Sequence, residues 1–277
     1  EEQSRKYDNF FPSLAFSFPL GKVQMQLAYR ASIKRPSYWD LRGNITYANR
    51  YTYETGNPLL QPTTIQSLSL NTIYRWMSLS LSYNHYKNDY TSYVRAYSEE
   101  NLTIGLLTRE HIAPYNRLSA SLTLSPVIGK WSPRWGVQVQ RYDCKVDTPR
   151  GVETFDNPRA ILSWRNTVKF TDSFWINADA YYQTKSQIDN TEYLENSWYM
   201  NLNLYKGFLN NRMSLQLQVT DLFNTRKSHV LMYSGLRTME LDNELRRTIS
   251  LTFRYKFNPT KSKYRGTGAG QSQKARM

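Results

Sequence analysis

Three histidines are the first candidates for metal binding or acid–base chemistry in this sequence. His85, His111 and His229 stand far apart and show no ligand spacing, whereas the ligands of known zinc sites recur within a few residues of one another. Cys144 is the single cysteine, so an intrachain disulfide and a thiolate cluster are both excluded. Neither Gly-x-Ser-x-Gly nor His-Glu-x-x-His occurs. We therefore expect no metal site, no cofactor and no enzymatic activity.

The carboxylates show no catalytic pattern either. They cluster in polar segments, at residues 99–100 and 240–244, where solvated loop charge is a better explanation than a paired acid and base. Asp221, followed by Phe223 and Asn224, is expected to shape a turn through its side-chain carboxylate. The glycine-rich stretch at 266–270 resembles a phosphate-binding loop, but it lacks the Lys-Ser/Thr pair of a P-loop. We expect a linker there.

The chain is strongly basic, with a formal net charge of +14 and a pI of about 9.7. A nucleic-acid partner would account for this charge. However, the basic residues are scattered along the whole sequence, without the clustered face that a nucleic-acid footprint requires. We expect no nucleic-acid partner, and instead a basic interior and basic loops that face outer-membrane lipid and acidic lipopolysaccharide.

Along much of the sequence, apolar and polar side chains alternate with a period of two residues, and this pattern defines the secondary-structure elements that would position any site. Between residues 247 and 258, apolar side chains such as Ile249 and Leu251 alternate with polar ones such as Arg254 and Lys256, which predicts a strand with one apolar and one polar face. Aromatic residues make up 14% of a chain whose mean hydropathy is only −0.66, a combination typical of membrane barrels. No apolar run approaches the roughly 18 residues that a membrane helix needs.

The same alternation recurs in about eleven strands. Short turns, as at 19–22 and 171–173, alternate with long polar connections, of which 33–62 is predicted as a long loop. Outer-membrane barrels have short periplasmic turns and long extracellular loops. We predict an all-β, transmembrane antiparallel β-barrel over residues 1–258 and a basic, disordered periplasmic tail over 259–277. Because the first and last strands both run toward the periplasm, while complete bacterial barrels have an even strand count, we expect the C-terminal part of a larger barrel.

Three sets of side chains are expected to have distinct surroundings. Polar residues on the inner rows are expected to line the lumen or to meet a plug: Asn201, Asn203, Gln216, Gln218, Arg254 and Lys256. Aromatic residues beside short turns are expected in a periplasmic girdle: Trp76, Trp131, Phe170, Phe174, Tyr205, Tyr255 and Phe257. Tyrosines in long connections are expected to contact a ligand, with packing between loops as the open alternative: Tyr47, Tyr51, Tyr53 and Tyr233.

Four stretches resemble a known family. They are Arg35-Pro36-Ser37-Tyr38-Trp39-Asp40-Leu41, Gly56-Asn57-Pro58-Leu59-Leu60-Gln61-Pro62, Val219-Thr220-Asp221-Leu222-Phe223-Asn224-Thr225 and Lys263-Tyr264-Arg265-Gly266-Thr267-Gly268. In this order and spacing, they resemble the C-terminal barrel of TonB-dependent outer-membrane receptors. The most similar branch is the outer membrane protein β-barrel family typical of Bacteroidetes.

This resemblance implies a 22-stranded barrel around an N-terminal plug, with the present strands as its C-terminal half. It also implies a Gram-negative outer-membrane location, a bulky nutrient as ligand, and contact with the TonB complex through the plug. Neither a plug nor a TonB-contacting box is visible in this chain. Two alternatives stay open: a passive or secretion-type channel without energy coupling, and a soluble β-rich binding module.

Overall fold

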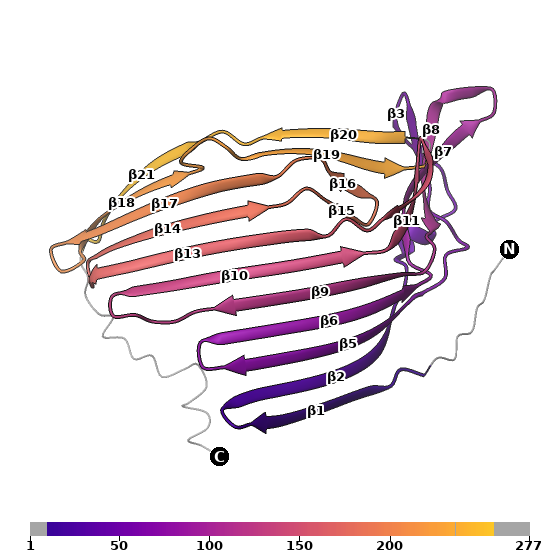
Figure 1. The fold of residues 1–277 in the computed structure, drawn as a ribbon. Helices are drawn as coiled ribbons and strands as arrows, with labels where there is room; N and C mark the ends of the chain where they lie inside the picture. The colour runs from indigo at the N-terminus through magenta and orange to yellow at the C-terminus, as the bar shows by residue number, and fades with distance from the viewer. Residues whose placement is uncertain (1–9, 236, 258–277) are drawn as a thin grey trace, which may run out of the picture.

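The computed structural model describes residues 10–235 and 237–257, which form one large antiparallel sheet with structured connections (Figure 1). This sheet has eleven strands, so the predicted all-β class and the predicted strand count are confirmed. In sheet order the strands are β1 (Ser13–Leu20), β2 (Val23–Lys34), β5 (Thr63–Tyr74), β6 (Met77–Lys87), β9 (Tyr115–Leu124), β10 (Trp131–Tyr142), β13 (Arg159–Thr171), β14 (Phe174–Gln183), β17 (Ser197–Phe208), β18 (Met213–Thr220) and β21 (Thr248–Tyr255).

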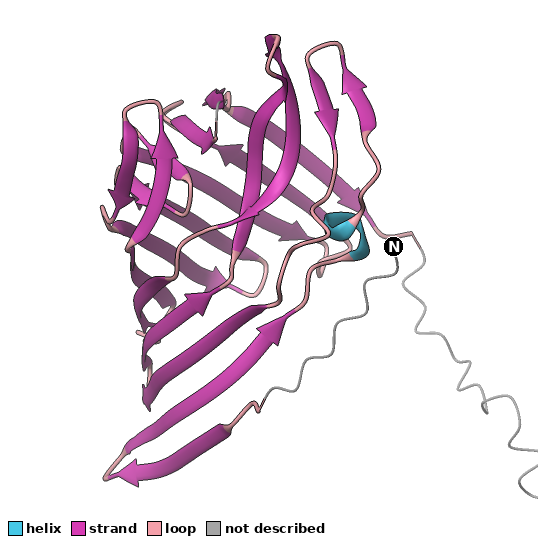
Figure 2. Cartoon of the chain, turned by 90° about the vertical axis from the view of Figure 1, so that its right-hand side faces the viewer, coloured by secondary structure: helices cyan, strands magenta, loops and turns pink. Residues whose placement is uncertain are grey.

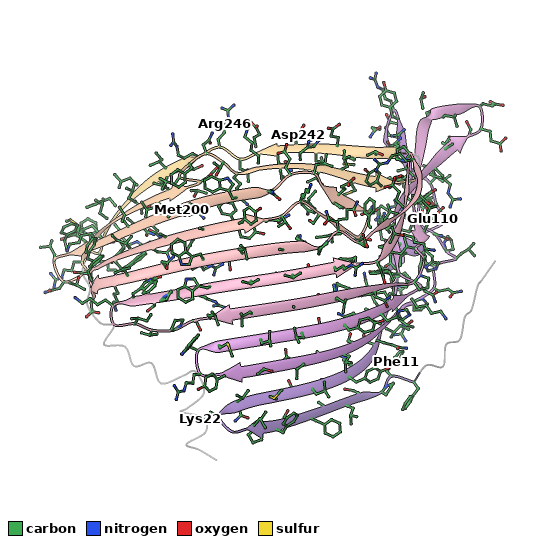
Figure 3. All side chains as sticks on the ribbon, in the orientation of Figure 1. Phe11, Lys22, Glu110, Met200, Asp242 and Arg246 are labelled. Atoms are coloured by element: carbon green, nitrogen blue, oxygen red, sulfur yellow. The ribbon has the colours of Figure 1, made fainter. Side chains whose placement is uncertain are left out.

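The sheet is curved and open, and its two ends differ in character (Figures 1 and 2). Short turns join the strands at one end, where Figure 3 labels Lys22, and long connections leave from the other, where it labels Glu110. β1 and β21 are the two edges of the sheet. Every residue of both edge strands is exposed, because each strand has a paired neighbour on one side only.

Each face of the sheet has its own chemistry. One row across five adjacent strands runs Leu27, Leu70, Leu81, Ala120 and Val139 in direct register. The row beside it, on the opposite face, runs Gln26, Asn71, Ser80, Ser121 and Gln138. Because side chains alternate between faces along a strand, the sheet has one apolar face, suited to lipid, and one polar inner face, as in outer-membrane barrels.

The long connections are more ordered than the sequence predicts. They contain one helix and ten further strands: α1 (Tyr38–Leu41), β3 (Thr46–Asn49), β4 (Thr52–Glu54), β7 (Tyr90–Ser98), β8 (Asn101–His111), β11 (Cys144–Thr148), β12 (Gly151–Phe155), β15 (Ser186–Ile188), β16 (Thr191–Tyr193), β19 (Lys227–Ser234) and β20 (Arg237–Glu244). These strands form three further sheets, with the orders β3-β4-β8-β7, β11-β12 and β15-β16-β19-β20. The predicted long loop at 33–62 corresponds to the connection between β2 and β5, and it contains α1, β3 and β4, whose strands of three or four residues are too short to show alternation.

Two further predictions concern membrane crossing and the tail. Among the described residues, no helix has both the length and the apolar character that spanning a membrane requires. The predicted tail at 259–277, residue 258 and the family-like stretch at 263–268 lie outside the described residues, so the boundary at 258 stays a prediction.

Candidate ligand-binding face

The first family-like stretch folds around Asp40. Ser37 caps α1 in a reciprocal capping box with Asp40, which satisfies backbone groups at the helix start. The Asp40 carboxylate also accepts hydrogen bonds from Arg109 Nε at 3.1 Å and from the Tyr90 hydroxyl at 3.3 Å. Partial burial acts to raise the pKa of Asp40, but the bonds from Ser37 and the charge of Arg109 outweigh it and hold the pKa below its usual value. The carboxylate therefore stays ionised and keeps these partners.

The second family-like stretch is hydrogen-bonded to the first. Asn57 N–H donates to the Asp40 carbonyl at 2.6 Å, and the Asn57 side-chain amide donates to the Arg109 carbonyl at 2.9 Å. A Cβ atom on Gly56 would lie 2.5 Å from the Asp40 carbonyl oxygen and 2.7 Å from the Arg42 nitrogen. Position 56 therefore requires glycine, because the two backbones approach each other too closely for a side chain. We call these two stretches the loop joint. Among the other residues of these stretches, Pro62 is buried, Pro36 is half-buried, and Arg35 and Pro58 are exposed.

Asp221 organises the turn that ends β18. Its side chain is only 1% exposed, and its carboxylate accepts hydrogen bonds from the Thr225 and Arg226 backbone N–H groups, each at 2.9 Å. Asn224 adds a bond from the Arg247 N–H to its side-chain oxygen at 3.0 Å, while Phe223 is exposed and packs on Trp198. The geometry agrees with a turn-shaping role for Asp221.

Connections that are distant in sequence are joined at the long-loop end. The Arg237 guanidinium donates to the carbonyls of Tyr51 at 3.0 Å and Thr103 at 2.7 Å. A parallel bridge pairs Val94 with Gly235. In Figure 1 the far end of the β19–β20 hairpin accordingly lies beside β7 and β8. The long connections therefore form one packed assembly rather than separate loops.

The predicted ligand-contacting tyrosines fall into two environments. Tyr47 and Tyr51 are 67% and 48% exposed, and the partly buried Tyr53 packs edge-to-face on Tyr47 and stacks on Tyr97. These rings are accessible, and ligand contact stays a prediction for them. Tyr233 differs, because it is 6% exposed and its hydroxyl donates to Glu192 at 2.8 Å. Its ring packs in the loop assembly, which is the alternative that the sequence left open.

The buried centre of the loop assembly also contains the cysteine. Tyr233 packs edge-to-face on Phe155, and Cys144 belongs to the same cluster. Burial raises the pKa of the Cys144 thiol to about 12, so the thiol is protonated and unreactive at neutral pH.

The predicted lumen-lining residues share one face of the sheet. Asn203 lies opposite Gln218 in the register of β17 and β18, and the Gln216 amide donates to Asn203 at 3.0 Å. Asn201 accepts a hydrogen bond from the Asp221 N–H at 2.9 Å. Arg254 lies opposite Ser214 on the same face. Lys256 follows the end of β21, and its N–H donates to the Arg212 carbonyl at 2.8 Å.

An aromatic and basic cluster lies at the long-loop end of this inner face. Tyr181 of β14 and Tyr199 of β17 lie opposite each other in register and stack with ring centroids 5.1 Å apart. The Arg226 guanidinium lies 4.5 Å from the Tyr199 ring centroid. These residues line an open cavity of about 430 Å³ together with Tyr193 and Lys227. We call Tyr181, Tyr199 and Arg226 the mouth cluster.

Sequence reasoning did not identify the mouth cluster. Tyr181 and Tyr199 each adjoin another aromatic residue, Tyr182 and Trp198, so alternation alone does not mark them, and only strand register brings them together. Register also corrects the predicted girdle. The Tyr205 and Trp175 rings stack with centroids 5.3 Å apart. An even number of positions separates Tyr205 from Tyr199 on β17 and Trp175 from Tyr181 on β14, so these side chains lie on the same, inner face. Tyr205 therefore faces the lumen instead of lipid.

The sheet is antiparallel, has one apolar and one polar face, and has short turns at one end and long connections at the other. These features identify the fold as part of an outer-membrane β-barrel. The chain belongs to the outer membrane protein beta-barrel family, whose model matches residues 1–255. This assignment confirms the family resemblance. A comparison with curated protein sequences gives no match.

Solved structures with a similar fold include a ferric enterobactin receptor and two siderophore receptors. A mutant ferric enterobactin receptor of Pseudomonas aeruginosa in complex with enterobactin is 18% identical, with a TM-score of 0.55 over 88% of this chain and 40% of the receptor. The siderophore receptor PirA of the same organism is 15% identical, with a TM-score of 0.57 over 79% of this chain and 39% of the receptor. PirA of Acinetobacter baumannii is 13% identical, with a TM-score of 0.55 over 90% and 41%. The chain thus spans about two fifths of the length of these receptors.

Proposed function

We propose that this chain is the barrel portion of a TonB-dependent outer-membrane receptor that takes up a bulky, anionic nutrient. In this proposal the long connections face the medium, while the short turns and the tail at 259–277 face the periplasm of a Gram-negative cell of the Bacteroidetes type. A plug domain occupies the lumen and contacts the TonB complex. The nutrient binds at the loops and passes along the polar inner face.

The mouth cluster is the observation that carries this proposal. Stacked tyrosine faces bind planar or aromatic groups, and a guanidinium binds carboxylate or phenolate oxygen atoms. The lining of this cavity includes Arg226 and Lys227 and no carboxylate among the described residues. Because Lys227 forms an ion pair with Glu244 at 2.8 Å, Arg226 supplies the positive charge. An anionic ligand with planar groups is the class that this chemistry favours.

Uptake by cells that carry the full-length gene tests the proposal. The probes are radiolabelled ferric enterobactin, the ligand named for one structural neighbour, a large oligosaccharide and a large peptide. We expect uptake of at least one probe to fall to background when either this gene or the gene for TonB is deleted. Uptake that continues without TonB supports a passive channel instead, and unchanged uptake of all three probes in the gene deletion contradicts a receptor function.

Alanine variants of the mouth cluster test the role of these residues. With the probe that the receptor imports, Arg226→Ala and Tyr199→Ala are each expected to weaken binding about fivefold to tenfold, since a cation–π contact contributes about 1 kcal/mol. Tyr182→Ala is the matched control, because Tyr182 adjoins Tyr181 on the opposite face of β14. It should bind like the wild type at equal surface abundance. Equal losses in all three variants would argue against a ligand site at the mouth cluster.

A further inference from the structure

Three metal-binding side chains converge on the β19–β20 hairpin. His229 Nε2 lies 2.6 Å from Glu240 Oε1 and 3.9 Å from Asp242 Oδ1. One ligand atom from each residue lies within 4.8 Å of the other two. No other group of three or more such side chains with this proximity occurs among the described residues. None of the three side chains lines the cavity of the mouth cluster, although their neighbours Ser228 and Asn243 on the same hairpin do.

Strand pairing explains why these residues meet. His229 lies directly opposite Asp242 in the register of β19 and β20, and Glu240 lies two residues away on the same strand and face. All eight residues of each strand are paired from Lys227↔Glu244 to Ser234↔Arg237, and β16 pairs with the other side of β19. The backbone therefore holds the three ligands in place. No short ligand motif marks them, because eleven positions separate His229 from Glu240 in the sequence.

The geometry fits the coordination shell of a small divalent ion. In a tetrahedral site with bonds of about 2.1 Å, neighbouring ligand atoms lie about 3.4 Å apart. The separations of 2.6 and 3.9 Å bracket that value, so small side-chain rotations suffice. Both carboxylates are exposed, at 62% for Glu240 and 71% for Asp242, which leaves an open path for the ion and for a water ligand. We propose that His229, Glu240 and Asp242 bind a divalent first-row transition-metal ion of the zinc type.

The electrostatic surroundings favour a cation at this position. The carboxylates of Glu240 and Asp242 bring two negative charges close to the His229 imidazole, at 2.6 and 3.9 Å. The nearest lysine on this face, Lys227, is neutralised by Glu244 at 2.8 Å. A neutral imidazole with two carboxylates balances the charge of a divalent ion. One nitrogen and two oxygen ligands suit zinc and its neighbours better than calcium or magnesium, which bind through oxygen.

Calorimetric titration of zinc sulfate into the full-length protein in detergent tests the site. We expect one zinc ion per chain in the wild type. His229→Ala and Asp242→Asn should each weaken zinc binding at least about tenfold, the size of effect that changes to the outer shell of a metal site already produce. Glu244→Gln is the matched control, because Glu244 lies on the same face of β20 and pairs with Lys227 instead. It should change the zinc affinity less than about twofold.

Copper provides an independent signature of the ligand set. The electron paramagnetic resonance spectrum of the Cu²⁺-loaded wild type should show coupling to one imidazole nitrogen, and this coupling should be absent in His229→Ala. Absence of saturable zinc binding, or equal affinity in His229→Ala and Glu244→Gln, overturns the proposal. The experiment needs no knowledge of the nutrient or of TonB, so its failure leaves the proposed receptor function standing.

Discussion

Asp221→Ala is expected to destabilise the barrel by about 3 kcal/mol. The carboxylate is buried and accepts hydrogen bonds from two backbone N–H groups, of Thr225 and Arg226, and each donor left unpaired in a buried turn costs about 1–3 kcal/mol. Asp221 also has a backbone φ of 54°, which aspartate tolerates better than alanine. Urea unfolding of the full-length protein in detergent, followed by tryptophan fluorescence, measures the change in the free energy of unfolding.

Asp172→Asn is the control for Asp221→Ala. Asp172 lies in a short turn, is 94% exposed and pairs with the exposed Lys169. Surface ion pairs of this kind contribute little to stability, so we expect a change below about 0.5 kcal/mol. If Asp221→Ala costs no more than Asp172→Asn, the turn does not depend on the buried carboxylate and the account of this motif is wrong.

Gly56→Ala is expected to disrupt the loop joint. The added Cβ would approach three backbone atoms, at 2.5 Å for the Asp40 carbonyl oxygen and 2.7 Å for both the Arg42 nitrogen and the Arg42 carbonyl oxygen. Backbone cannot rotate away as a side chain can, so the cost is expected at about 3 kcal/mol, the upper part of the range for overpacking. Hydrogen exchange followed by mass spectrometry should show faster exchange at the Asn57 amide and through α1, β3 and β4.

Gly43→Ala is the matched control in the same connection. A Cβ at Gly43 would meet only Pro58 Cγ, at the ordinary contact distance of 3.7 Å. We expect Gly43→Ala to leave exchange in these elements close to that of the wild type. Similar exchange in the two variants would mean that the close approach at Gly56 does not hold the connection together.

The strands of the main sheet were predictable because apolar and polar residues alternate along them. In β21, for example, Ile249 and Leu251 lie on one face and Thr252 and Arg254 on the other, as the sequence indicates. The strands in the connections were not predictable by the same means. β4, with only three residues, is defined by its pairing with β8, and such pairing between distant segments leaves no local pattern.

In the sites, too, contacts between residues close in sequence were predictable, whereas contacts that depend on the pairing of distant segments were not. Asp221 acts on residues four and five positions away, so its turn-shaping role was visible in the sequence. Tyr181 and Tyr199 meet through the register of β14 and β17, and His229 and Asp242 through that of β19 and β20. For Tyr233 the sequence left ligand contact and loop packing both open, because a tyrosine in a long connection can be exposed or buried, and it is the structure that shows its ring packed against Phe155.

Surface labelling tests the central claim, an outer-membrane barrel with its long connections outside the cell. The full-length protein, with Cys144→Ser as background, receives one cysteine, as Glu99→Cys in the β7–β8 turn or as Asp172→Cys in a short turn. A maleimide carrying a polyethylene glycol chain too large to cross the outer membrane is added to intact cells. The account predicts that Glu99→Cys is labelled in intact cells and Asp172→Cys only after the outer membrane is permeabilised. Labelling of Asp172→Cys but not Glu99→Cys in intact cells would contradict it.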